Sequence, residues 1–353
     1  RAVLACELMA REMVGANAAI FQTLDDAVSS LGHHIPNSGS PRWISTNPNE
    51  RGFLKDSKVL NIVKIGQNRS VLHLEYGGFS FFSTVGFSEK IELSHLTEID
   101  TTSSQLTVIL FEGNVKPNCG PLEIIQNIGG QDKNSDLGYT GHPPALVLPL
   151  YPLIRIFKFT GGVIDDFWQA HFMLCLEEAM ATGSWMDQEL FRSLKTMSEL
   201  DSAKIPYSVL CRSIFDHDRT SLFLALYRCL EALYSYAATA SLVSSLGIQK
   251  DWKVVSKQLE IDLRWYPKED AALQGLFQRA GLKELIDISN SLKIPQEPLD
   301  TLSGRSARAI YDIRNKSVHF RPFHQGVDFD LIDWSKLCTA LSCIVLDVYN
   351  EIG

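Results

Sequence analysis

The spacing of apolar side chains predicts helices at the start of the chain and strands in its middle. Residues 2–31 are rich in Ala, Leu, Met and Glu, which favours one or two helices ending at Gly32. From about Gly52 to Gly162, short β-branched and aromatic runs are separated by Gly, Asn, Pro and Ser, as is typical of strands. The clearest runs lie at residues 71–87, 90–99, 105–113 and 144–159.

One run has the alternation of a half-buried strand. Leu72, Leu74 and Tyr76 are apolar, whereas His73 and Glu75 between them are polar. Because side chains of a strand point alternately to its two faces, this period of two predicts one buried face. The middle of the chain offers no catalytic constellation, and we expect a sensing or docking role for it.

After Gly162 the apolar spacing becomes helical and remains so to the end. Gly183 is expected to stop a first helix, and Pro206 marks a joint. Five long helical segments follow, at residues 220–247, 252–265, 269–292, 300–320 and 333–353. The chain is therefore expected to be α+β, with an all-α helical bundle at its C-terminal end. The expected segments are an N-terminal helical part and loop (1–48), a β-rich domain (49–162), linking helices (163–205) and the all-α domain (206–353).

Composition limits the function classes. The chain has 353 residues and a net charge of -8, so a bulk positive field cannot hold nucleic acid, and any phosphate-binding surface must be local. The longest weakly charged stretch, residues 143–154, is short and contains four prolines, so we expect no membrane partner. Seven scattered cysteines without a C-x-x-C pair favour a reduced, cytoplasmic protein.

Common cofactor and metal motifs are missing from the sequence. The nine histidines form no H-E-x-x-H motif, and neither a G-x-G-x-x-G nor a Walker phosphate loop is present. We therefore expect no cofactor and no dedicated metal site.

The helical segment 220–247 has a thin polar line on a mostly apolar surface. Arg228, Glu231 and Ser235 follow one another at i, i+3 and i+7 and would share one helix face. Because a buried charge is costly unless it is paired, Glu231 should have a cation partner, either Arg228 or a group from another helix. An internal structural ion pair would account for this line without any catalytic role.

The segment RNKSVH places Arg314, Asn315 and His319 close together in the sequence. On an ideal helix Arg314 and His319 are about 140° apart, so they converge only where the helix ends or where a second copy joins them. Asn315 and His319 are i and i+4, and a carboxamide at that spacing can fix the orientation of an imidazole ring. A second pair with the same spacing, Arg212 and His217, has Ser after the Arg, and we assign it no role.

Positive charge is concentrated around this segment. The segment between residues 301 and 325 contains four arginines, one lysine and a single acidic residue, which gives a formal charge of +4 in a chain whose net charge is -8. Arg314 offers a planar fork for a phosphodiester, and Lys316, Arg321 and Arg308 would add donors for the substrate.

These residues resemble the HEPN family (higher eukaryote and prokaryote nucleotide-binding domain), whose signature is Arg, a polar residue, about three variable positions and His. The resemblance covers roughly residues 206–353. It implies a metal-independent endoribonuclease in which Arg314 and His319 are the catalytic pair and Asn315 positions them. It also implies a homodimer whose two motifs face one cleft, and cleavage by the 2′-hydroxyl of the RNA itself. Glu231 would support Arg314 from the neighbouring helix.

Three functions remain open at this point. The first is an RNA-cleaving effector of a toxin or anti-phage abortive-infection type, controlled by a regulatory protein or a phage-derived trigger. The second is a non-catalytic HEPN-like module that binds RNA or a nucleotide, or that dimerises a larger defence assembly. In the third, Arg314 is a salt-bridged arginine, His319 a half-buried histidine near a helix end, and the chain a structural or adaptor protein.

Overall fold

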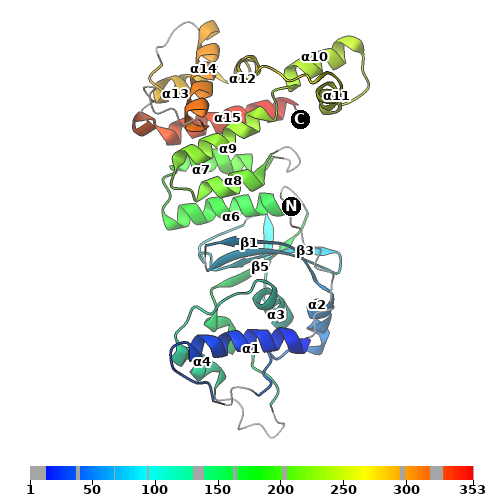
Figure 1. Ribbon diagram of the computed structural model, residues 1–353, viewed down its shortest axis with the longest axis vertical. Helices are drawn as coiled ribbons and strands as arrows, with labels where there is room; N and C mark the ends of the chain where they lie inside the picture. The colour runs from blue at the N-terminus through cyan, green and yellow to red at the C-terminus, as the bar shows by residue number, and fades with distance from the viewer. Residues whose placement is uncertain are drawn as a thin grey trace. The chain divides into compact units, whose positions relative to one another are not determined.

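The protein is α+β, as predicted. A computed structural model describes residues 13–36, 40–66, 68–93, 95–129, 139–161, 164, 166–200, 205–294, 299–318 and 329–352. An antiparallel sheet lies in the N-terminal half, and the C-terminal half is helical in its described residues (Figure 1). The chain forms two compact units, residues 1–170 and 171–353, and helix α6 (Phe167–Thr182) spans the boundary between them.

Unit 1 is built on a five-stranded sheet in the order β1-β2-β3-β5-β4, with every neighbouring pair antiparallel. The strands are β1 (Lys58–Ile65), β2 (Arg69–Tyr76), β3 (Phe79–Val85), β4 (Leu96–Ile99) and β5 (Ile154–Phe159). The alternation predicted at residues 72–76 is confirmed in β2, where Leu72 and Leu74 are fully buried. Gly77 and Gly78 both have positive φ and close the tight β2–β3 turn.

Helices cover one face of this sheet (Figure 1). They are α1 (Met13–Ser29), α2 (Arg51–Asp56), α3 (Ser103–Glu112) and α4 (Pro121–Ile128), with short turns η1 (Pro48–Glu50), α5 (Pro144–Val147) and η3 (Leu148–Leu150). Leu24 of α1, Leu106 of α3 and Ile156 of β5 belong to one buried cluster. The N-terminal helix and the sheet therefore share a core instead of forming the separate segments expected at residues 1–48 and 49–162.

The strand predicted at residues 105–113 is wrong, because these residues form helix α3. A capping box begins the helix: the Thr102 hydroxyl accepts a hydrogen bond from the Gln105 amide, and the Gln105 side chain accepts one from the Thr102 amide. The helix is buried on nearly all sides, so its apolar run has no period that separates helix from strand.

Unit 2 is helical throughout its described residues. After α6 it contains α7 (Gln188–Met197), α8 (Tyr207–Ile214), α9 (Arg219–Glu231), α10 (Tyr236–Leu246), α11 (Trp252–Leu263), α12 (Glu269–Phe277), α13 (Leu282–Ser291), α14 (Leu299–Val318), η4 (Phe329–Leu331) and α15 (Trp334–Ile352). Helix α15 packs against α7, α9 and α13, and α14 packs against α12, α13 and α9. Helix α7 lies in the segment 163–205, which was expected to hold linking helices, but it packs against α15 and belongs to the core of unit 2.

One predicted helix stop, Gly183, is confirmed, and one predicted helix is broken. Gly183 and Gly247, both with positive φ, follow the ends of α6 and α10. The single helix expected over residues 220–247 ends at Glu231, where backbone bonds tighten to i−3. Ser235 therefore does not continue the polar line of Arg228 and Glu231. Among the described residues, no helix has the length and apolar character needed to cross a bilayer.

Candidate functional site

The last turns of α14 place Arg314 beside the C-terminal end of α9. Arg314 Nη2 donates to Glu231 Oε1 at 3.1 Å. The two side chains are 21% and 31% exposed, so water and a ligand can still reach the pair. The expectation that Glu231 has a cation partner is confirmed, and the partner comes from another helix, whereas Arg228 is exposed.

Asn315 binds the same guanidinium group. Arg314 Nη1 donates to Asn315 Oδ1 at 2.9 Å, so a carboxylate and a carboxamide hold the two terminal nitrogens of Arg314. These two bonds use two of the five N–H donors of a guanidinium. The two bonds fix the orientation of the guanidinium group, and its other N–H donors take no part in them.

Tyr227 of α9 lies against the guanidinium of Arg314, and Tyr234, in the turn after α9, is hydrogen-bonded to Tyr227. The Cζ atom of Arg314 lies 5.8 Å from the centre of the Tyr227 ring, a cation–π distance. The Tyr234 hydroxyl donates to the Tyr227 hydroxyl at 2.6 Å. Burial raises the pKa of Tyr227 to about 12 and raises the pKa of Tyr234 as well, so both hydroxyls keep their protons near neutral pH.

Carboxylates dominate the electrostatics around Arg314. Burial lowers the pKa of Arg314, but the negative charges of Glu231 and Glu269 outweigh that effect and hold the pKa above its ordinary value. The guanidinium is therefore permanently charged. The same two carboxylates reduce the positive potential that a phosphate would meet.

The structure does not bring Arg308 and Lys316 to Arg314. Arg308 Nε lies 3.4 Å from Asp312 Oδ1, on the exposed surface of α14. Lys316, one turn after Asp312, lines a cavity of about 310 Å3 with residues of α13 and the segment around η4. Positions 308, 312 and 316 share one helix face, about 120–160° away from position 314. Within the described residues 301–318, the expected positive patch is thus divided over two helix faces, and Arg308 and Arg314 are each paired with an acid.

His319 and Arg321 lie outside the described residues. Helix α14 is described to Val318, the residue immediately before His319. The predicted contact between Asn315 and His319 therefore stays a prediction.

Three residues that the sequence did not predict as a site, His171, Cys175 and Cys211, lie together in unit 2. Both ring nitrogens of His171 lie 3.8–3.9 Å from Cys175 Sγ, and the three residues are buried. Burial acts to raise the pKa of the Cys175 thiol, but the hydrogen bond with Cys211 and the His171 ring hold it below its usual range. The i, i+4 spacing of His171 and Cys175 was a visible signal, whereas Cys211 lies on a different helix.

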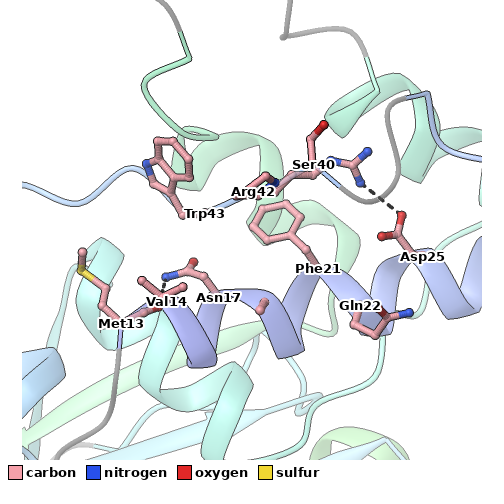
Figure 2. Close-up of a pocket in the computed structure, with 11 residues that line it drawn as sticks. Met13, Val14, Asn17, Phe21, Gln22, Asp25, Ser40, Arg42 and Trp43 are labelled. Carbon is pink, nitrogen blue, oxygen red and sulfur yellow. Dashed lines mark hydrogen bonds and ion pairs between the residues drawn. The ribbon is translucent and has the colours of Figure 1, made fainter.

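Unit 1 has a cavity of about 480 Å3 between α1 and residues 40–43 (Figure 2). Figure 2 shows Phe21 and Trp43 on its walls and the guanidinium of Arg42 directed at Asp25. Arg42 Nη1 lies 3.1 Å from Asp25 Oδ1, and its side chain is 2% exposed. The described lining combines apolar and aromatic side chains with a few polar groups, as is typical of ligand-binding pockets.

Comparison with protein-family models, with curated proteins and with solved structures finds no match to this chain.

Proposed function

We propose that this chain is a metal-independent endoribonuclease of the HEPN type in which Arg314 and His319 cleave RNA. The observation that supports the proposal most is the double contact of Arg314 with Glu231 and Asn315. A catalytic arginine must point its charge at a fixed place, because electrostatic stabilisation depends on groups that are oriented before the reaction begins. Arg314 is oriented in this way while about a fifth of its side chain stays exposed.

The reaction uses the RNA as its own nucleophile. The 2′-hydroxyl attacks the neighbouring phosphorus and loses its proton, and the 5′-oxygen leaves and gains one. His319 moves these protons, and Arg314 stabilises the charge on the pentacoordinate phosphorus. The products are a 2′,3′-cyclic phosphate and a 5′-hydroxyl, and Glu231 acts as a positioning residue for Arg314.

In its cellular setting, the protein would act in the cytoplasm as a toxin or an anti-phage abortive-infection effector. Two copies would form a homodimer with both motifs at one cleft. Unit 1 would serve as the sensing or docking part, with the cavity beside α1 as its ligand site, and a regulatory protein or a phage-derived molecule would be the trigger.

A second function, a non-catalytic module that binds RNA or a nucleotide or that dimerises an assembly, is favoured by the charge pairing. Arg314 is paired with Glu231 and is close enough to Glu269 to be affected by its charge, and Arg308 is paired with Asp312. Such compensation weakens attraction to phosphate, so of these roles it favours dimerisation of an assembly over binding of RNA or a nucleotide. With its charges paired in this way, α14 would serve a structural role in unit 2.

The chemistry of the cut ends distinguishes the two functions. Purified protein is incubated with total RNA, and the fragments are labelled directly by polynucleotide kinase, which accepts 5′-hydroxyl ends. We expect new labelled fragments whose 3′ ends resist phosphatase until acid opens the cyclic phosphate. RNA that binds the protein and stays intact would favour the non-catalytic module, and 5′-phosphate ends would contradict the proposed mechanism.

A further inference from the structure

We propose that His171, Cys175 and Cys211 bind a structural zinc ion inside unit 2. Their ligand atoms, one ring nitrogen and two sulfurs, all lie within 4.8 Å of one another. Such a site goes beyond the proposed nuclease function and does not rest on it, because none of these residues belongs to α9 or α14.

The fold concentrates these groups on facing helix surfaces. His171 and Cys175 are i and i+4 on α6 and therefore lie on one helix face. Glu178, at i+7 from His171, shares that face. Cys211 comes from α8, so the ion would join two helices that are separate in the sequence.

The chemistry of the three groups fits zinc. Thiolate and imidazole ligands select zinc over magnesium or calcium, which prefer oxygen. In a tetrahedron with roughly 2.3 Å Zn–S and 2.0 Å Zn–N bonds, ligand atoms are about 3.5–3.8 Å apart. The His171 nitrogens are 3.8–3.9 Å from Cys175 Sγ, close to these separations, and Cys211 Sγ lies within 4.8 Å of both residues' ligand atoms, so side-chain rotation has to shorten its distances further on metal binding.

Burial favours a structural ion over a catalytic one. His171, Cys175 and Cys211 are 2%, 0% and 3% exposed. A catalytic zinc keeps one position open to water or substrate, whereas a structural zinc is closed by four protein ligands. We assign the fourth position to Glu178, which is 1% exposed and lies on the same face of α6.

Zinc content of the purified full chain tests the proposal. Protein produced in zinc-supplemented medium and purified with a non-chelating reductant should retain about one zinc per chain by mass spectrometry. Cys175→Ser and Cys211→Ser should lose most of it. Cys338→Ser, which changes an equally buried cysteine of α15 outside the cluster, should retain it.

Cobalt substitution gives a readout that does not depend on how the variants fold. Wild-type protein reconstituted with Co2+ should show the thiolate charge-transfer and intense visible bands of a tetrahedral site. Wild-type protein with reduced thiols that contains no zinc and develops no such bands would overturn the proposal. A Cys175–Cys211 disulfide in metal-free protein would overturn it as well. Equal loss of zinc to a chelator in Glu178→Gln and wild type would overturn the assignment of Glu178.

Discussion

At the scale of single residues, the pair of Arg314 and Glu231 matters for orientation more than for stability. Both side chains are partly exposed, and ion pairs of this kind typically contribute about 0–1 kcal/mol. Asn315 adds a second restraint on the same guanidinium. The cost of losing one restraint should therefore be visible in the reaction and small in the free energy of unfolding.

Glu231→Gln tests this directly. It keeps the size of the side chain and removes its charge, so Arg314 loses its main orienting partner. We expect the cleavage rate constant kcat to fall on the order of 10–100-fold with little change in KM, since displacement of a catalytic group costs rate more than binding. The free energy of unfolding should fall by less than about 1 kcal/mol.

Glu189→Gln is the matched control for that experiment. Glu189 forms an exposed ion pair with Lys283, at 3.2 Å, elsewhere in unit 2. Its loss should leave kcat and KM unchanged. Equal effects of the two substitutions on kcat would show that Glu231 has no special role.

At the scale of helices and strands, α3 shows how a cap decides between helix and strand. Thr102 and Gln105 satisfy each other's backbone amides at the start of this buried helix. Thr102→Ala should cost about 1 kcal/mol in the free energy of unfolding, as is typical for the loss of an N-cap side chain. Denaturant unfolding of the whole protein measures this cost.

Thr101→Ala is the control, because Thr101 precedes the cap and has similar partial exposure. It should change the free energy by less than about 0.5 kcal/mol. If both substitutions cost the same, the cap is not what stabilises α3.

Elements with a clear period were predictable, and elements buried on all sides were not. The period of two in β2 and the glycine stop of α6 depend on local geometry, which the order of residue types along the chain indicates directly. The run that forms α3 is buried on nearly every side, its polar residues Ser104 and Thr107 included, and has no such period. The break after Glu231 is a tight turn of i−3 bonds with a hydrogen bond from Tyr234 to Tyr227, and no glycine or proline between residues 231 and 235 indicates it in the sequence.

The candidate site was predictable only in part, for a related reason. That Glu231 needs a cation follows from the cost of burying its charge, but which helix supplies that cation is a matter of packing. Arg308 and Lys316 are near Arg314 in the sequence and on another face of α14. Cys211 joins His171 and Cys175 only because α8 lies against α6.

At the scale of the whole molecule, the net charge of -8 limits how RNA can be held. The basic residues of α14 are divided over two faces, so one copy presents few free positive charges at Arg314. A second copy would double the charge at a shared cleft. It would also bring His319 of one copy to Arg314 of the other, although an ideal helix places the two residues of one copy about 140° apart.

Light scattering tests this arrangement. We expect a particle of twice the 39.5 kDa chain mass at micromolar concentration in the active protein. Dilution below the dimer dissociation range should reduce the specific cleavage activity, because each cleft would lose half of its groups. A strictly monomeric protein with full activity would contradict the shared cleft.

Catalysis by Arg314 is tested most directly by the rate of RNA cleavage by Arg314→Ala, measured beside wild type in the presence of EDTA. Arg212→Ala is the matched control, since Arg212 begins the other Arg–His pair of the same spacing. The proposed mechanism predicts cleavage by wild type and by Arg212→Ala, and a loss of about 100-fold or more in Arg314→Ala. Cleavage by a folded Arg314→Ala variant at the wild-type rate, or intact RNA with wild type under every activating condition, would contradict it.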